Sequence, residues 1–204
     1  MFKKTVLAVA LALGTMVGGA ATAATVNVGD AAINRQLSDG FSNFVVGFTN
    51  ENFVDGTLTG WEVYVERING NASSGSLALL VLTSIGGGNY QVTGIDTRTV
   101  QVGLNTFTSS IATTATSILG VFMGTAKVSY DLISQPSGPD VYNGNGAVSS
   151  PLSVGSTVAL TAGSTDRIYS INATVAPVPL PAAGFLLIGA LGGLAALRRR
   201  KMVA

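Results

Sequence analysis

Short apolar stretches, each ended by a cluster of turn-forming residues, constrain the fold of this chain more than any other feature. Between residues 24 and 176, Thr, Val, Ser, Gly and Asn dominate, and turn clusters such as residues 69–71 and 86–89 separate the apolar runs. Runs of this kind are typical of strands, and no convincing amphipathic helix is present. The pattern predicts an all-β body.

Two segments indicate different kinds of burial. Within residues 58–67 apolar positions alternate with polar ones, Trp61, Val63 and Val65 against Glu62, Tyr64 and Glu66. Such alternation places one set toward a core and the other toward solvent. Residues 77–83 are almost continuously apolar, as expected of a strand covered on both faces.

Further strands are expected at several places along the same region: residues 41–48, 90–94, 99–107, 117–123, 127–133, 156–161 and 167–175. Eight or nine strands at this spacing predict an antiparallel β-sandwich of jelly-roll type.

The N-terminal residues 1–23 have the three zones of an export signal. Lys3 and Lys4 supply positive charge, residues 6–17 are nearly unbroken apolar sequence, and Ala21 and Ala23 form a small-residue cleavage site for signal peptidase. The alternative is an uncleaved anchor, but the apolar run is short for a hydrocarbon core of about 30 Å. We therefore expect the body to be exported.

The C-terminal residues 180–197 are eighteen consecutive residues without a charge. As a helix they would span about 27 Å, close to the thickness of a bilayer core. The basic cluster that follows is expected to remain cytoplasmic: Arg198, Arg199, Arg200 and Lys201. A single transmembrane helix, with the body on the outer side of the inner membrane, agrees with both the N-terminal export signal and the C-terminal basic cluster.

A short motif precedes this apolar segment, consisting of Val178, Pro179, Leu180, Pro181 and Ala182. Motif, apolar helix and basic cluster together resemble the VPLPA-CTERM sorting domain, a variant of the PEP-CTERM signals of exopolysaccharide-producing Gram-negative bacteria. The resemblance covers residues 177–201 and implies that an exosortase recognises the tail and cleaves near the motif. The chain is then a substrate of that enzyme.

The conformational preferences of proline agree with recognition of the motif by a processing enzyme. Pro179 and Pro181 disfavour helix and keep the segment extended, which is the form that a protease-like cleft engages. An ordinary single-pass anchor is the alternative. Gly189 and Gly193 form a small-xxx-small pair that favours helix dimers, although such a pair is often coincidental in a glycine-rich helix.

The body carries a second resemblance. The order "TGWEVYVE", an apolar strand, "YQVTGIDTRTVQVGLNTFT" and "ILGVFMGTAKVSYD", within residues 57–131, is similar to a jelly-roll module of exported proteins. A Gly-Asp pair usually precedes the "ILGVF" strand in that module. Here Thr116 and Ser117 stand in its place, so no role of that carboxylate carries over.

Composition excludes several chemistries. The chain has no Cys and no His, which removes disulfides, thiolate and imidazole metal sites, and Cys- or His-based catalysis. Six of the eleven basic residues lie in the terminal segments, so the middle carries five basic against ten acidic residues, a formal charge of −5. Such a body is a poor nucleic-acid binder.

The remaining candidate sites use carboxylates and aromatic rings. Glu62 and Glu66 lie about 13 Å apart along one strand, too far for the paired acids of a glycosidase, so we predict no catalytic residues and no enzyme. Tyr64, with Glu62 and Glu66 on the same face, is the best candidate for saccharide contact. The other tyrosines that could contribute are Tyr90, Tyr130, Tyr142 and Tyr169.

Calcium is the remaining ligand to weigh. The Gly/Asn-rich residues 137–146, with Asp131, Asp140 and Asp166 near loops, offer oxygen ligands for a structural calcium ion. They follow no known calcium motif, and a solvated surface turn is the simpler interpretation. We predict no cofactor and no metal.

The sequence therefore predicts three parts: a signal peptide (1–23), a β-sandwich (24–176) and a sorting tail (177–204). The expected role is that of an exported cell-surface or matrix protein, structural or adhesive in an exopolysaccharide or biofilm context. The two alternatives are a lectin-like carbohydrate-binding module and a carbohydrate-active enzyme. Expected partners are signal peptidase, the exosortase, the inner membrane before processing and extracellular polysaccharide, with no nucleic acid.

Overall fold

The computed structural model describes residues 24–38, 42–68, 71–72, 74–132, 140–142, 148, 151–163 and 167–178. These residues form strands, turns and loops without any helix, and all paired strands are antiparallel. The expectation of an all-β, antiparallel body is thereby confirmed, and Ala24–Pro177 forms one compact unit. The predicted signal peptide and C-terminal helix lie outside the described residues. In the described part, nothing has the length and apolar character of a membrane-crossing helix.

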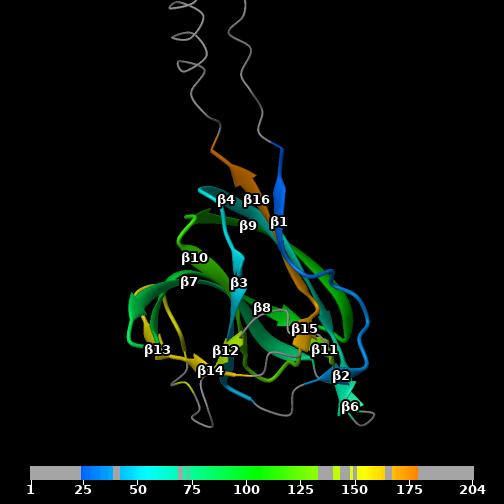
Figure 1. Ribbon diagram of the computed structural model, residues 1–204. Helices are drawn as coiled ribbons and strands as arrows, with labels where there is room; N and C mark the ends of the chain where they lie inside the picture. Colours follow the sequence, from blue (N-terminus) through cyan, green and yellow to red (C-terminus); the bar gives the residue numbers. More distant parts are fainter. Residues whose placement is uncertain are drawn as a thin grey trace, which may run out of the picture. The chain divides into compact units, whose positions relative to one another are not determined.

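A four-stranded sheet contains both ends of the body. Its strand order is β1-β16-β4-β9, made of β1 (Val26–Gly29), β16 (Ile171–Pro177), β4 (Gly56–Val65) and β9 (Gly103–Thr113). Val26 pairs with Val175 in antiparallel register. The chain therefore enters and leaves the body at the same end, where the blue and orange strands lie side by side (Figure 1).

A seven-stranded sheet faces it, with the order β13-β8-β7-β10-β3-β12-β14. Its long strands are β3 (Phe44–Asn52), β7 (Gly75–Gly86), β8 (Asn89–Val100) and β10 (Ser117–Met123). Its short strands are β12 (Asp140–Tyr142), β13 (Thr157–Ala159) and β14 (Thr161–Ala162). Two small sheets complete the body. One has the order β15-β11-β2, made of β15 (Arg167–Tyr169), β11 (Ser129–Leu132) and β2 (Leu37–Ser38). The other pairs β5 (Arg67–Ile68) with β6 (Asn71–Ala72).

The main hydrophobic core lies between the two large sheets. The four-stranded sheet contributes Leu58, Trp61 and Ile171 to it, and the seven-stranded sheet contributes Leu79 and Leu119. This two-layer arrangement is consistent with a β-sandwich. Trp61, the single tryptophan, is only 1% exposed, as its alternation with Val63 and Val65 predicts.

A second core covers the opposite face of the seven-stranded sheet. Alternate residues of β7 point into the two cores, with Leu79 in the main one and Leu80 in the second. Val158 and Leu160, together with the half-buried Leu152, cover this face. The continuous apolar run of β7 is therefore explained by burial on both sides.

A group of polar contacts ties the two large sheets together beside the main core. The indole Nε1–H of Trp61 donates to Asp96 Oδ2 at 2.8 Å, and Asp96 also forms an ion pair with Arg98 at 2.8 Å. Arg98 in turn donates to the carbonyl of Thr108 at 2.9 Å and lies over the ring of Phe107. Strand β8 is thus fastened to β4 and β9 of the other sheet.

The strand boundaries differ from the expected ones in two informative places. Residues 99–107 were expected to be one strand, but β8 ends at Val100 and β9 begins at Gly103, because a turn intervenes. Asn105 closes this turn, accepting from the Gln101 amide and donating to the Gln101 carbonyl. Residues 167–175 likewise divide at Ser170 into two strands of different sheets.

Candidate functional site: the outer face of the four-stranded sheet

The solvent-facing side of the four-stranded sheet, here called the outer face, is built from alternate residues of its strands. One row crosses the sheet through the partners Asn172, Glu62 and Thr106, beginning at Gly29 of β1. A second row crosses it through Asn27, Thr174, Gly60 and Thr108. Their sequence neighbours, such as Trp61 and Ala173, are buried, so these side chains point away from the core.

Hydrogen bonds between strands hold these polar side chains in place. Thr106 Oγ1 donates to Glu62 Oε1 at 3.3 Å, and Thr174 Oγ1 donates to Asn27 Oδ1 at 3.2 Å. Asn172 Nδ2 donates to the Gly29 carbonyl at 3.2 Å. The outer face is therefore an ordered array of hydroxyl and amide groups.

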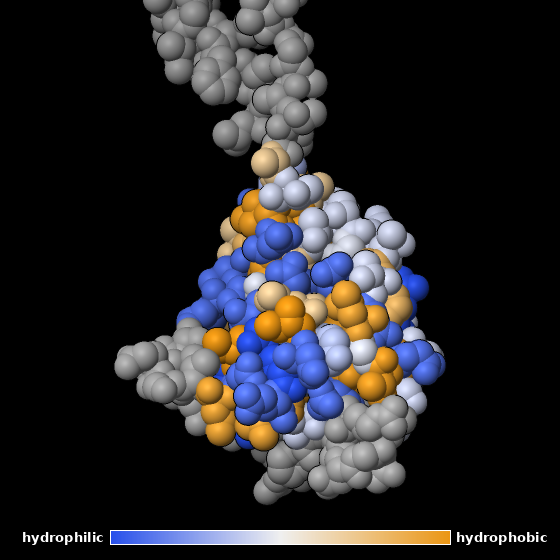
Figure 2. Space-filling model, turned by 90° about the vertical axis from the view of Figure 1, so that its right-hand side faces the viewer, coloured by the Kyte–Doolittle hydropathy of each residue, from blue (hydrophilic) through white to orange (hydrophobic). Residues whose placement is uncertain are grey.

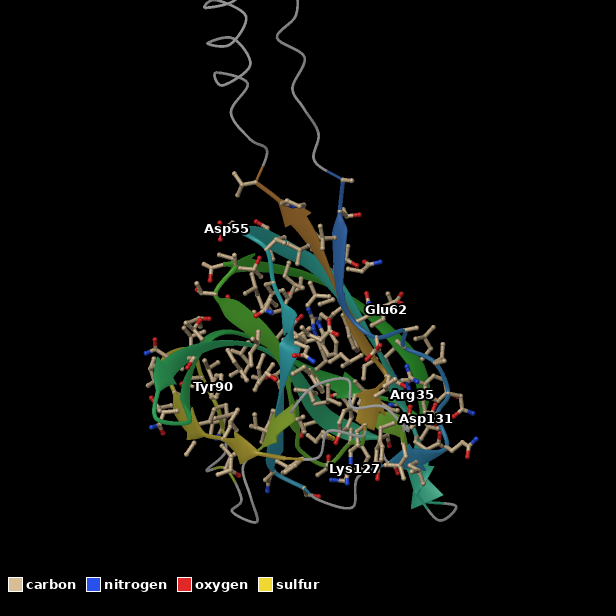
Figure 3. The ribbon with its side chains drawn as sticks, viewed as in Figure 1. Arg35, Asp55, Glu62, Tyr90, Lys127 and Asp131 are labelled. Carbon is tan, nitrogen blue, oxygen red and sulfur yellow. The ribbon has the colours of Figure 1, made fainter. Side chains whose placement is uncertain are left out.

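Tyr64 lies at one end of this array. It is half-exposed and pairs across the strands with Leu104, which is 58% exposed. Glu62, two residues earlier on β4, projects from the same face (Figure 3). Glu66 follows the last residue of β4, so it does not belong to the rows of the sheet, and its amide donates to the Lys127 carbonyl at 3.2 Å.

The other tyrosines considered from the sequence do not join Tyr64. Tyr169 is buried against Phe48, and Tyr130 contacts both the ring of Tyr169 and the guanidinium of Arg167. Tyr90 packs against the second core, at the opposite side of the body from Glu62 (Figure 3). The side chain of Tyr142 lies outside the part of the chain that the structure describes.

The charge of the outer face is very low. Within the strands of this sheet, Glu62 and Tyr64 are the two ionisable side chains. A pair of carboxylates facing each other across a cleft, as glycoside hydrolysis requires, is not formed by these strands. Hydroxyl and amide groups beside one aromatic ring are suited instead to a neutral, hydroxyl-rich ligand. Figure 2, viewed from the right-hand side of Figure 1, shows hydrophilic and hydrophobic residues mixed over the coloured surface.

A separate group of charged residues lies where β1 leads into the loop before β2. Arg35 forms an ion pair with Asp131 at 3.3 Å, visible in Figure 3, and Asp131 Oδ1 accepts from the Gln36 amide. Glu51 Oε2 accepts from the Gly29 amide at 2.7 Å. Burial, followed by repulsion from Glu51, raises the pKa of Asp30 above its usual value, while Arg35 lowers it.

These carboxylates fasten the loop after β1 to β3 and β11, which is a structural use of charge. In the described part of the chain, no group of three or more acidic side chains is arranged to hold a metal ion. Asp131, one of the candidates for calcium, is occupied by Arg35 and by the Gln36 amide. The side chain of Asp140, and Asp166 altogether, lie outside the described residues.

The cleavage-site residues Ala21 and Ala23 and the sorting residues from Pro179 onward also lie outside the described residues. Val178, the first residue of the motif, is 64% exposed directly after β16 ends at Pro177. At the position of the expected Gly-Asp pair, Ser117 is buried and its hydroxyl bonds the Thr114 carbonyl at 2.9 Å.

Searches against family models, curated proteins and solved structures returned no match to this chain. The site is therefore defined by its own geometry. Sequence reasoning found Tyr64 and Glu62 but missed their neighbours on the other strands, Asn27, Thr106, Asn172 and Thr174. The alternation of exposed positions in residues 103–113 was a usable signal, whereas the pairing of β1 with β16 joins residues 26 and 175 and has no local signal.

Proposed function

We propose that this chain is an exported bacterial cell-surface or extracellular-matrix protein, structural or adhesive, whose tail is sorted by an exosortase. The observation that carries the proposal is the position of the VPLPA motif. It begins at Val178, immediately after the last strand of the body, and is followed by an apolar segment and a basic cluster. A processing enzyme can reach an exposed segment that directly follows a folded domain more easily than one within it.

The pairing among the described strands suits a display role for the body. The described strands find their partners within residues 24–177, and β16, the strand that leads to the tail, is held between β1 and β4. We assign the sandwich to the jelly-roll type, on the grounds that its sheets are antiparallel and that strands distant in sequence are neighbours, such as β10 beside β3.

A test of sorting compares two double variants in a strain with an active exosortase. Pro179→Ala/Pro181→Ala removes the stiff motif, and Gly189→Ala/Gly193→Ala changes the apolar helix to a similar extent but keeps the motif. We expect the proline variant to accumulate in the inner-membrane fraction at precursor length. The wild type and the glycine variant should reach the outer surface or the medium. Wild-type chain retained unprocessed in the inner membrane would refute the sorting proposal.

The outer face favours a second candidate function, the binding of a neutral saccharide. Tyr64 offers an aromatic ring, and Glu62, Thr106 and Asn172 offer hydrogen-bonding groups in one row beside it. Sugar rings stack on aromatic side chains while their hydroxyls bond to such polar groups.

Glycan-array binding tests this candidate. Tyr64→Ala should abolish retention, whereas Thr57→Ala, on the same strand and also exposed, should leave retention unchanged. If the wild-type protein retains no saccharide, the outer face has another role, and the sorting proposal is unaffected.

A further inference from the structure

The free edge of β9 is unusual among the edges of the two large sheets. β9 has eleven residues, whereas the strands at the other edges, β1, β13 and β14, have four, three and two. Among the described residues, β9 pairs with β4 alone. Long unpaired edges are templates for the addition of another strand, and proteins usually shorten or charge them.

The sequence of β9 contains none of the usual protections. Residues 103–113 include no charged residue and no proline. Arg98 covers the edge at one point, where it donates to the Thr108 carbonyl at 2.9 Å. A bulge follows, because the pairing shifts between Thr108 and Ile111. Both features lie at Thr108 or beyond it.

The first half of β9 is regular and open. From Gly103 to Thr108 its pairing with β4 is continuous, without a register shift. Leu104 is 58% exposed here and Thr106 is exposed, while Phe107 of the inner face is only half-buried. An additional strand at this edge would cover apolar surface on both faces of the sheet.

We propose that two copies of this chain associate by pairing the 103–107 segments of their β9 strands in antiparallel register, joining their four-stranded sheets into one. The chemistry of the edge selects a second copy as the partner. A neutral strand meets its own copy without repulsion between like charges, and Leu104 and Thr106 of each copy face equivalent groups on the other. The nearest charge, Arg98, is neutralised by Asp96. A charged peptide would find no complementary charge on this strand.

Disulfide trapping can test this pairing without interference from native thiols, because the chain has no cysteine. The test variant is Leu104→Cys/Thr106→Cys. An antiparallel pair centred on residue 104, 105 or 106 brings two of these positions directly opposite each other, with Cβ atoms about 5 Å apart. Within one chain the two cysteines lie about 7 Å apart along the strand, too far for a bond that needs Cβ atoms about 4 Å apart.

The matched control is Thr57→Cys/Thr59→Cys on the neighbouring interior strand β4, whose two side chains are also exposed. Both variants are made in the full chain, extracted in detergent and treated with a mild oxidant. We expect a covalent dimer for the β9 variant and monomer for the β4 variant. Association through the terminal segments would affect both variants alike. Equal cross-linking of the two, or none in either, overturns the proposal.

Hydrogen exchange on the unmodified full chain provides a second measurement that does not depend on the folding of a variant. At a concentration about ten times the dissociation constant, the amides of residues 103–107 that point away from β4 should exchange about tenfold more slowly than in dilute solution. Amides of β1 should show no such change. Exchange at β9 that is independent of concentration would contradict the pairing.

Discussion

Trp61 shows how a single side chain serves both packing and orientation. Its ring is buried beside Phe107, with ring centroids 4.7 Å apart, while its one polar atom reaches Asp96 of the opposite sheet. A buried indole N–H without an acceptor is costly, so Asp96 determines how the ring sits in the core. Asp96 is itself held in place by its ion pair with Arg98.

Replacing Asp96 by Ala should therefore destabilise the body by about 1–3 kcal/mol, because the indole N–H loses its acceptor and Arg98 loses its partner. Urea unfolding followed by the fluorescence of the single tryptophan measures this change. Glu62→Ala on the outer face serves as the control and should change stability by less than about 0.5 kcal/mol. Equal stability of the two variants would contradict the assigned role of Asp96.

Asp30 provides a prediction about pH. Burial and the nearby Glu51 raise its pKa in the folded state, so the folded protein holds this proton more tightly than the unfolded chain. The contribution of Asp30 to stability is therefore lost as the pH rises above its ordinary value of 3.8 and through the folded pKa. Asp30→Asn should be more stable than the wild type at pH 7, with the difference shrinking toward pH 3. A difference that grows on acidification would have the wrong sign for this mechanism.

At the scale of the strand, side-chain patterning predicted the all-β, antiparallel body and several of its strands. The strand β10 (Ser117–Met123) coincides with its expected bounds, and both the two-sided burial of β7 and the inward position of Trp61 follow from local patterns. These features depend on residues close in sequence. Burial of alternate or consecutive positions leaves a direct trace in the order of residues.

The features that were missed depend on distant partners. β1 (Val26–Gly29) is too short to be recognised from its sequence and is held by β16, nearly 150 positions later along the chain. The three-residue β12 is likewise defined by its pairing with β3. The candidate site combines strands from both ends of the body, so the sequence predicted only the Tyr64 and Glu62 portion, which lies on one strand.

The backbone at the junction of β1 with the loop that follows requires a glycine, and a substitution can test this requirement. Gly29 has φ +97°, and a Cβ atom there would lie 2.5 Å from the Ile171 carbonyl oxygen. Gly29→Ala should cost about 2–3 kcal/mol, because strain and steric conflict add. Gly155 has a similar φ of +92° with no atom within 4 Å, so Gly155→Ala should cost only about 1 kcal/mol. Equal losses in denaturant unfolding would show that the contact with β16 is unimportant.

At the scale of the whole molecule, we propose separate tasks for the body and its ends. Because β1 and β16 are neighbours, the sequences expected to direct export and sorting both join the body at one end of the four-stranded sheet. The outer face and the β9 edge belong to the same sheet, so binding of a saccharide and pairing between copies would use adjoining surfaces. Such a combination suits a component of an extracellular matrix, in which each molecule contacts both polymer and neighbouring molecules.

The mass of the mature C-terminus tests the central claim most directly. Protein recovered from the outer surface or medium of a strain with an active exosortase would be digested and its C-terminal peptide identified by mass spectrometry. We predict a C-terminus at or beside residues 178–182, with Arg198, Arg199, Arg200 and Lys201 absent. A mature protein that still ends at Ala204 would contradict the claim that the tail is a removable sorting signal.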